Sequence, residues 1–472
     1  MSTALVILIA YIVILFAVSW YSTKLTTKGG ALGYLLANRK LPVLVVATMV
    51  AGLAIGGAST VGVAQNAYAH GGLSAGMYNA AWGVGAIIVG LIAAAKYRQL
   101  EISTIPELFQ KYYSTGGKII GVIGQIILQL VITSLQYIAG GAVLSALLPQ
   151  YFSFSTGMLV TAIVFVGITL IGGYWAAGLS NVINVIVIYV GIVTGVIVAL
   201  HKYGGFASIS SQLPASVPWF SPVRGLGLSI VVAWFVVMIT QAHSLQAVTQ
   251  IAFAAKDEKT ARNGFILGGI LILPVGFLAA IFGIIAAAKF PGLENAAMAL
   301  PTVVLTLSPA IAGLTLAGLW AADVSTAVGL LLGSATLVVN DMWKPYVRHT
   351  MTDKEGIWLS RLVVLLLSVL TYILATSIGS ILSTLTTALA MTCSYAILLL
   401  GPLYFPKLCR KSSAIWTILV SMIVLAVWML VPSTHIVSQV IYLEWPICIL
   451  TFLLVSIFDK NRANIPSLQK TT

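Results

Sequence analysis

The sequence predicts an all-α polytopic membrane protein with thirteen transmembrane helices. Only 7% of the 472 residues are charged, 60% are hydrophobic, and the mean hydropathy is +1.05. Soluble proteins carry about a quarter charged residues, so this composition excludes a soluble enzyme and a disordered chain. The 83 residues from Ile119 to His201 contain no Asp, Glu, Lys or Arg. That stretch alone has room for three spans of about 20 residues each.

Apolar runs separated by short loops place the spans along the chain. The first run has no signal-peptide cleavage pattern after it, so we expect it to be retained. No loop is long enough for a soluble domain, so residues 1–472 are expected to form a single transmembrane domain. The predicted spans are 3–23, 42–69, 73–95, 119–147, 154–174, 180–200, 226–249, 264–288, 309–338, 357–376, 379–402, 413–431 and 441–457.

The basic residues predict the orientation of these spans. Loops on one side hold 21 Lys and Arg residues, whereas the opposite loops hold only Lys202, Arg224 and Lys289. Positive loops face the cytoplasm, so we expect the N-terminus outside and the C-terminus inside a cell (plasma or inner) membrane. The net charge of +13 is therefore interpreted as a topology signal and not as nucleic-acid binding. The lipid bilayer is the expected partner, and no obligatory protein partner is evident.

Two further features have simple interpretations. The cytoplasmic stretch 96–118 contains an amphipathic segment with Pro106 near its start and Phe109 and Tyr112 on one side. It predicts either a short interfacial helix or a plain connector. The cysteines have no spacing typical of a metal site or a disulfide framework, and we interpret them as apolar packing residues. They are Cys393, Cys409 and Cys448.

The second span carries the sequence signal of a broken helix. Gly52, Gly56, Gly57 and Gly62 fall at its middle, with small hydroxyl residues between them. A single glycine in a membrane helix usually permits close packing. Four glycines beside hydroxyls at midspan predict an unwound segment whose free backbone groups face an ion or solute cavity.

Spans four and nine each place polar residues on one helical face. In span four, Gln129, Thr133 and Gln136 share a face with Gln125. That face either forms hydrogen bonds between helices or lines a polar pathway. In span nine, Ala322, Ser325, Thr326 and Gly329 share a face. Two hydroxyls and a backbone carbonyl suit a hard monovalent cation, although such hydroxyls often bond back to their own helix.

Asp323 is the one acidic residue that the sequence places deep within the membrane. No Lys or Arg lies at the middle of a predicted span to pair with it. It must therefore bind a cation, carry a proton or accept a hydrogen bond from a polar neighbour. At 100° per residue it lies about 60° from Thr326, beside the hydroxyl face. We expect either coupling of its protonation to cation occupancy or a neutral carboxyl group at a helix contact.

Several motifs spread over about 300 residues resemble one known family. They are AGLAIGGASTVG, AYAHGGLSAGMYNAAWG, TIPELFQKYY, GGYWAAGLSNVINVI, QAVTQIAFAAKDEKTARNG and ADVSTAVGLLLGSATLVVNDMWKP. In this order they are similar to the sodium:solute symporter family. The resemblance implies a LeuT-like core of two inverted five-helix repeats, about 42–200 and 226–402. One helix (3–23) precedes the core and two (about 413–457) follow it.

The resemblance also implies a sodium site and narrows the solute. In the family, the sodium ligands are two backbone carbonyls of the first core helix and one carbonyl and two hydroxyls of the eighth. The matching residues in this sequence are Gly52 and Ile55 on the first core helix and Ala322, Ser325 and Thr326 on the eighth. Positions that hold a second sodium in some members correspond here to Asn181, Val328 and Gly329, so one sodium ion is expected. Sugar-transporting members carry Gln at the position of Ser59 and a carboxylate near Tyr78 or Asn79. Proline transporters carry Asp at the position of Ala54. Sugar and proline are therefore disfavoured.

The leading hypothesis is a secondary active symporter that imports a small organic solute (a carboxylate, amino acid or vitamin-like molecule) with sodium by alternating access. A proton-coupled or exchange carrier using Asp323 is the alternative, and a transport-derived sensor is a weaker one. No nucleophile–base set is visible, so the protein is not expected to be an enzyme. The candidate substrate-binding residues are polar or small residues on three spans: Ala58, Ser59, Thr60, Gln129, Thr133, Gln136, His243, Ser244 and Gln246.

Overall fold

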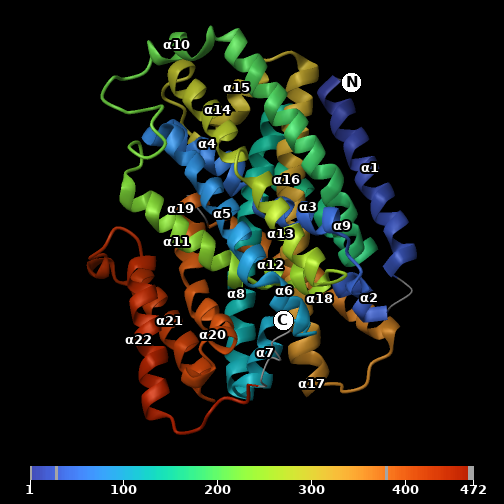
Figure 1. The fold of residues 1–472 in the computed structure, drawn as a ribbon. Coiled ribbons are helices and arrows are strands. Elements are labelled where there is room, and N and C mark those ends of the chain that lie inside the picture. Colours follow the sequence, from blue (N-terminus) through green and yellow to red (C-terminus); the bar gives the residue numbers. More distant parts are fainter. Residues whose placement is uncertain (1–2, 27–29, 378–380, 466–472) are drawn as a thin grey trace.

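The computed structural model describes residues 3–26, 30–377 and 381–465, and these residues are almost entirely helical (Figure 1). The helices are α1 Thr3–Thr26, α2 Gly30–Leu36, α3 Val43–Ala54, α4 Val63–Asn66, α5 Met77–Ile92, α6 Ala94–Gln99, α7 Ile105–Tyr112, α8 Thr115–Leu147, α9 Phe154–Lys202, α10 Gly205–Ser210, α11 Leu228–Ser244, α12 Gln246–Ala254, α13 Glu258–Ile272, α14 Val275–Lys289, α15 Ala299–Leu305, α16 Pro309–Thr336, α17 Lys344–Tyr346, α18 Asp353–Ala375, α19 Ile381–Ala390, α20 Thr392–Tyr404, α21 Ser413–Leu430 and α22 Ile441–Phe458.

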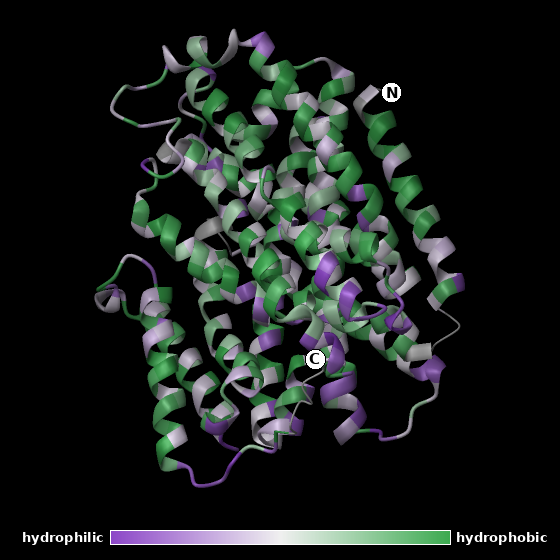
Figure 2. Cartoon of the chain, viewed as in Figure 1, coloured by the Kyte–Doolittle hydropathy of each residue, from purple (hydrophilic) through white to green (hydrophobic). Residues whose placement is uncertain are grey.

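The length and hydropathy of these helices confirm a polytopic membrane protein. Ten helical segments of the described chain are long and apolar enough to cross a bilayer, and two bent pairs raise the number to twelve. Apolar residues cover the middle of the molecule and polar residues gather at its ends (Figure 2). Because no water is available inside a bilayer, helices satisfy their own backbone groups there.

Helix α9 differs from the two spans predicted at 154–174 and 180–200. It runs without a loop for 49 residues, but Gly173 interrupts it with φ +59° and ψ −144°. A straight helix of this length would measure about 73 Å, more than twice the hydrocarbon core of a bilayer. The positive φ at Gly173 is a conformation that glycine adopts easily, so it is where the chain changes direction.

Helix α16 forms the centre of the molecule. It packs against α8 and α9, and nearly all of its side chains are buried. The buried Trp320 of α16 donates a hydrogen bond from Nε1 to Oγ1 of Thr161 on α9, at 2.9 Å. By contrast α1, α18, α21 and α22 expose many apolar side chains, as lipid-facing helices do. The elements that carry the candidate site therefore lie where the protein itself excludes lipid.

The short helix predicted near Pro106 is present as α7. The hydroxyl of Thr104 caps it by accepting a hydrogen bond from the Glu107 amide, at 3.2 Å. Its apolar side does not face the membrane surface, however. Phe109 and Tyr112 are buried, and the Phe109 ring stacks on Tyr395 of α20 with centroids 5.8 Å apart. The amphipathic face is therefore used for packing inside the protein.

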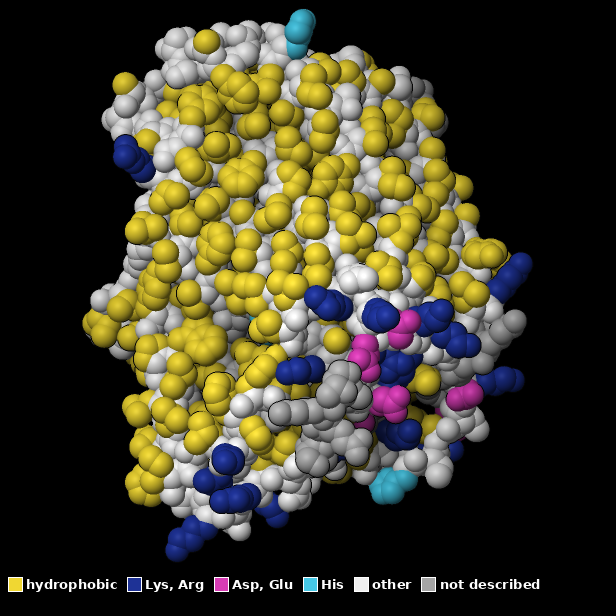
Figure 3. Space-filling model, in the orientation of Figure 1, with side chains coloured by type: hydrophobic (Ala, Val, Ile, Leu, Met, Phe, Trp, Pro, Cys, Tyr) yellow, Lys and Arg dark blue, Asp and Glu magenta, His cyan; other side chains and the backbone are white. Residues whose placement is uncertain are grey.

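Charged side chains gather at one end of the molecule. Most Lys, Arg, Asp and Glu residues in view lie at the end that carries α7 and α17, away from α10 and α15 (Figure 3). This uneven distribution is the physical basis of the topology signal in the sequence.

The carboxyl group of Asp257 caps the start of α13. It accepts a hydrogen bond from the Thr260 amide, and this hydrogen bond lowers the pKa of Asp257.

Long-range packing brings together polar groups that the sequence analysis did not connect. Glu444, in the first turn of α22, is fully buried, as Asp323 is. Cys393 and Cys448 are buried free thiols, as expected of packing residues, and their sulfur atoms lie 3.5 Å apart. Both features have the same cause: the packing of α20 against α22 brings together residues more than fifty positions apart.

Candidate functional site

The second predicted span is broken at its glycines. Helix α3 ends at Ala54, and Ile55 leaves the helical conformation with φ −89° and ψ 80°. The chain resumes in a π-helical turn, η3 (Ala58–Gly62), and the two pieces meet at 56°. The carbonyl of Gly56 accepts hydrogen bonds from the Ser59 amide at 3.0 Å and the Thr60 hydroxyl at 3.1 Å. The predicted break is confirmed.

Glycine is required at the break because neighbouring elements approach its backbone closely. A Cβ atom on Gly56 would lie 2.5 Å from Oγ1 of Thr326 and 2.6 Å from Oε1 of Gln136. A Cβ atom on Gly57 would lie 2.2 Å from Cβ of Ala139 on α8. Both are closer than real side-chain contacts, so any larger residue would push α8 or α16 away from the break.

The hydroxyl face of α16 meets the backbone of α3 just before the break. Oγ of Ser325 and Oγ1 of Thr326 donate hydrogen bonds to the carbonyl of Gly52, at 2.8 and 3.0 Å. Both hydroxyls also reach the carbonyl of Ala322, at 2.8 and 3.1 Å. Four of the five predicted ligand residues, separated by about 270 positions in the chain, thus bring oxygen atoms into one buried group.

The fifth residue, Ile55, lies at the break itself. Its amide still donates to Ala51 at 2.8 Å, but no side chain of α16 donates to its carbonyl in the described part of the chain. Asn181 of α9 also faces this group. Its Oδ1 is buried without a hydrogen-bond partner, and a Cβ on Gly52 would lie only 1.9 Å from that oxygen. The site is therefore packed closely from three helices.

Asp323 lies beside the break. Its side chain is fully buried, and neither carboxyl oxygen has a hydrogen-bond partner among the described residues. Oδ1 lies 3.0 Å from the place where a Cβ on Gly57 would stand. No Lys, Arg or His forms an ion pair with it within the described chain. A buried carboxyl group without a partner is unfavourable, so this position needs a proton or a cation nearby.

A second break, which the sequence analysis did not predict, interrupts the span expected at 226–249. Helices α11 and α12 meet at Leu245 with a bend of 46°. The side chain of Gln125 on α8 joins the two ends: its Nε2 donates to the Ser244 carbonyl at 2.7 Å, and its Oε1 accepts from the Gln246 amide at 2.9 Å. An amide side chain thus replaces the backbone partners that the break removes.

Another glutamine of α8 contacts the first break in the same way. Oε1 of Gln136 accepts a hydrogen bond from the Gly57 amide, at 2.9 Å. Gln129 lies between Gln125 and Gln136 on this face, and both polar atoms of its side chain are buried without partners in the described chain. The face of α8 therefore forms interhelical hydrogen bonds at two of its three glutamines. The third has polar atoms available for a ligand.

The remaining candidates differ in what they contact. The Thr133 hydroxyl donates a hydrogen bond to the carbonyl of Gln129, at 2.6 Å, and the Ser59 hydroxyl donates one to the carbonyl of Ala54. Nδ1 of His243 lies 2.8 Å from the Ile239 carbonyl, while its Nε2 is buried without a partner in the described chain. Ala58 and Thr60 line the first break, and Ser244 borders the second.

Gln246 is fully engaged elsewhere. Its Oε1 accepts from the Ile105 amide at 2.8 Å, and its Nε2 donates to the Ser103 carbonyl at 3.3 Å and to Gln250 at 3.1 Å. These contacts tie the second break to the start of α7. Both hydrogens of its Nε2 are thus used within the protein, and we leave Gln246 out of the proposed substrate site.

A buried ion pair joins α8 to the turn that follows α16. Nζ of Lys118 on α8 lies 3.5 Å from Oδ1 of Asp341, in the π-helical turn η7 (Leu337–Trp343) that follows α16. Both side chains are more than 95% buried, and Nζ also donates to Gln110 of α7 at 2.8 Å. The sequence analysis assigned Lys118 to a loop and missed this pair, because nothing local links positions 118 and 341.

Comparison with known families now identifies the chain. The model of the sodium:solute symporter family matches residues 34–440. The chain belongs to the sodium:solute symporter family. Among its relatives, the osmoregulated proline transporter OpuE of Bacillus subtilis is 25% identical, covering 77% of this chain and 76% of that protein. The sodium/pantothenate symporter of Escherichia coli is 24% identical, covering 71% of each.

Solved structures agree on the fold. The symporter resembles the substrate-bound outward-open state of a Na+-coupled sialic acid symporter with a TM-score of 0.81, at 16% identity over 98% of this chain and 99% of that one. It also resembles Mhp1, a nucleobase-cation-symport-1 family transporter, with a TM-score of 0.62, covering 90% and 93% of the two chains. The fold is LeuT-like, as the motifs implied. The protein is a sodium-coupled symporter of a small solute and not an enzyme.

Proposed function

We propose that this symporter carries one sodium ion bound between α3 and α16. The ligands are the carbonyls of Gly52, Ile55 and Ala322 and the hydroxyls of Ser325 and Thr326. The observation that supports this site most directly is that both hydroxyls of α16 reach the Gly52 carbonyl of α3, just before the first break. Hard monovalent cations prefer such oxygen ligands, and a site without an obligatory carboxylate suits sodium better than calcium.

The hydrogen bonds among these oxygen atoms indicate how the site accepts the ion. Each hydroxyl has one hydrogen and two lone pairs, so it can donate to a carbonyl or turn a lone pair toward a cation. Entry of sodium replaces the shared hydrogen bonds by five ion–oxygen contacts. One ion is proposed, because Asn181, Val328 and Gly329 supply no carboxylate or hydroxyl for a second.

Transport then follows from the position of the ion at the break. Sodium holds α3 and η3 against α16 and so favours the outward-open state, in which the solute binds beside the break. Rocking of the helix bundle exposes both to the cytoplasm, where they are released. Each sodium charge that moves inward contributes about 2.3 kcal/mol per 100 mV of membrane potential.

The proposed solute is a small organic carboxylate, amino acid or vitamin-like molecule. Its site comprises Ala58, Ser59 and Thr60 at the break, Gln129, Thr133 and Gln136 on α8, and His243 and Ser244 near the second break. The unpartnered polar atoms of Gln129 and His243 support this proposal, since buried polar groups normally have partners. A relative named for pantothenate falls within the same range of solutes.

We further propose thirteen spans in a cell membrane, with the N-terminus outside and the C-terminus in the cytoplasm. The kink at Gly173 supports the division of α9 into two spans. Two inverted repeats, about 42–200 and 226–402, are supported by the positions of the two bent pairs, because each pair occupies the first span of its repeat. The gathering of basic residues at one end supports the orientation.

A thermal-shift screen of the purified protein against a metabolite library tests this function. A solute that binds the native state raises the unfolding temperature by mass action, and coupling predicts that it does so in sodium but not in potassium. A hit identifies the solute class and tests the coupling together. A solute that stabilises the protein equally in both ions, and is taken up equally in both, would contradict sodium coupling at the proposed site.

A further inference from the structure

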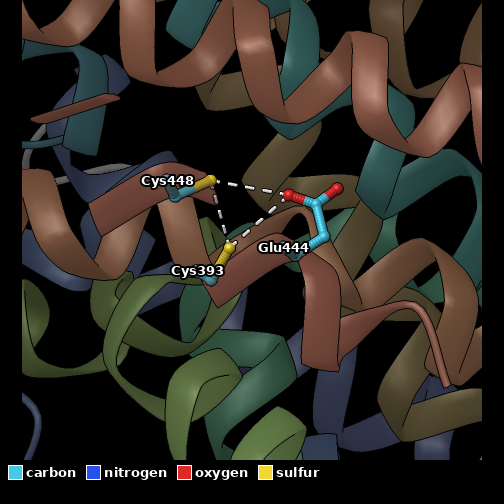
Figure 4. Close-up of side chains that lie close together, drawn as sticks. All are labelled: Cys393, Glu444 and Cys448. Carbon is cyan, nitrogen blue, oxygen red and sulfur yellow. Dashed lines mark hydrogen bonds between the residues drawn. The ribbon is translucent and has the colours of Figure 1, made fainter. Parts of the chain in front are cut away.

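Two cysteines and a glutamate form a cluster outside the symport site. Cys393 is the second residue of α20. Glu444 and Cys448 lie one turn apart on α22, so their side chains share a face. All three are fully buried and point toward one another (Figure 4). The two sulfur atoms are 3.5 Å apart, and Oε2 of Glu444 lies 3.7 Å from Sγ of Cys393 and 3.5 Å from Sγ of Cys448.

These distances match the edges of a tetrahedral metal site. With metal–sulfur bonds of about 2.3 Å and a metal–oxygen bond of about 2.1 Å, tetrahedral angles separate two sulfur ligands by about 3.8 Å and a sulfur from an oxygen by about 3.6 Å. The three observed separations each lie within about 0.3 Å of these values. An ion placed between the three atoms would therefore find its ligands already in position.

Unsatisfied polar atoms accompany the cluster. Oε1 of Glu444 is buried without a hydrogen-bond partner among the described residues, although Oε2 accepts from the Ser421 hydroxyl at 2.9 Å. Thr417, one turn before Ser421 on α21, also has a buried hydroxyl without a partner in the described chain. No Lys, Arg or His forms an ion pair with Glu444 within the described residues. One oxygen of this buried carboxyl group therefore accepts hydrogen bonds from Ser421 and the two thiols, whereas the other has no partner among the described residues.

We propose that Cys393, Glu444 and Cys448 bind one zinc ion. Two thiolates and the Glu444 carboxylate supply three donors, so the site with Zn2+ carries one net negative charge, and the fourth position remains for a hydroxyl or a water molecule. A mixed sulfur and oxygen set fits zinc, whereas magnesium and calcium take oxygen ligands and Cu+ favours sulfur alone. Binding releases the protons of the two thiols.

Zinc in this place would connect the outer helices to the transport core. It would join α22 to α20 beside Thr392, whose carbonyl accepts a hydrogen bond from Ser244 at 2.9 Å. Ser244 is the last residue of α11 before the second break. The ion would therefore fix the helix that supports this break, and it should stabilise the folded protein because it binds the native state.

Metal content of the purified full-length protein tests the proposal. The protein is stripped with a chelator under reducing conditions, incubated with ZnCl2, desalted and analysed by mass spectrometry for zinc. We expect about one zinc per chain, a loss of at least tenfold in C393S/C448S, and weaker binding in E444Q. C409S is the matched control, since Cys409 is buried near Tyr113 away from the cluster and should leave zinc unchanged.

Thiol reactivity of the wild-type protein provides a second test that does not depend on variant folding. At a denaturant concentration at which the buried thiols of the zinc-free protein react, zinc should slow the reaction of Cys393 and Cys448 with a membrane-permeable thiol reagent at least tenfold and leave Cys409 unaffected. Co2+ in place of zinc should show the absorption of a tetrahedral thiolate complex. Equal zinc content in wild type and C393S/C448S, or no change in the reactivity of the two thiols, would overturn the proposal.

Discussion

Ser325 and Thr326 illustrate how a membrane helix can make two hydroxyls available to an ion. A hydroxyl inside a helix normally donates a hydrogen bond to a carbonyl of the preceding turn. Here both do so, through Ala322, and both also reach the Gly52 carbonyl on another helix. Sharing hydrogens between two carbonyls leaves oxygen atoms clustered at one point, which is the arrangement a sodium ion needs.

Removal of both hydroxyls should weaken sodium binding without unfolding the protein. In S325A/T326A two of five proposed ligands are lost, and only small voids are left behind. We expect the sodium concentration for half-maximal uptake to rise at least tenfold in proteoliposomes. T315A on the same helix is the control, because that hydroxyl bonds to Gly191 away from the site. An unchanged sodium dependence in the double variant would rule out this site.

Asp323 should influence sodium binding through its charge. Its carboxyl group is buried beside the break and has no partner among the described residues, so a nearby sodium ion would stabilise the ionised form. D323N keeps the shape and removes the charge. If the two are coupled, sodium affinity of the wild type falls as the pH is lowered and that of D323N does not change with pH. The same pH dependence in both proteins would assign Asp323 a structural role.

At the scale of elements, α8 connects the two broken helices. Gln136 contacts the first break and Gln125 joins the ends of the second. The two glutamines are eleven residues apart, about 16 Å along the helix axis and close to three full turns, so they lie on one face. Movement of either break therefore strains a hydrogen bond to the same helix, which provides a physical link between the two repeats.

Bulk at the first break should abolish transport while allowing the protein to insert. G56L or G57L would place a side chain where atoms of Gln136, Thr326 or Ala139 already approach within about 2.6 Å. We expect uptake to fall to background while the amount of protein in the membrane stays similar. G167L is the control, since a Cβ there meets only the ring of Phe16, at 3.0 Å. Wild-type uptake by G57L would mean that the close approach is not needed.

The ion pair between Lys118 and Asp341 should stabilise the packing of α7, α8 and η7. Removing one member leaves the other charge buried and unpaired, which costs about 3–5 kcal/mol in typical proteins. D341A should therefore unfold at a lower temperature in detergent, and K118M/D341L should recover most of the loss. A double variant that is no more stable than D341A would show that the pair is not the origin of the effect.

At the scale of the whole molecule, the asymmetry of charge predicts orientation in the membrane. Gln212 lies two residues after α10, in a loop predicted to be outside, and Lys259 is the second residue of α13, next to a loop predicted to be inside; both side chains are exposed. Q212C should react with an impermeant maleimide added to intact cells, whereas K259C should react only after permeabilisation. The wild-type protein, whose three cysteines are buried, is the control. The reverse pattern would invert the proposed topology.

The sequence by itself determined the features that depend on local composition. Apolar runs identify membrane helices wherever they occur, and the glycines of 42–69 mark a break because glycine lowers the cost of leaving the helix. The face shared by Ser325 and Thr326 follows from helical periodicity alone. The tertiary structure decided what depends on distant partners. Leu245 breaks a helix without a local glycine signal, because the side chain of Gln125 supplies the missing hydrogen bonds from 120 residues away.

Long-range packing likewise decided which polar groups meet. Glu444 is buried and Cys393 adjoins Cys448 because α22 packs against α20, and Lys118 pairs with Asp341 because α8 passes the end of α16. No periodicity within a single segment reports such contacts. A local pattern reports the conformation that a segment favours and the face that it buries. Which two helices touch, and at which residues, is decided by the packing of many side chains at once.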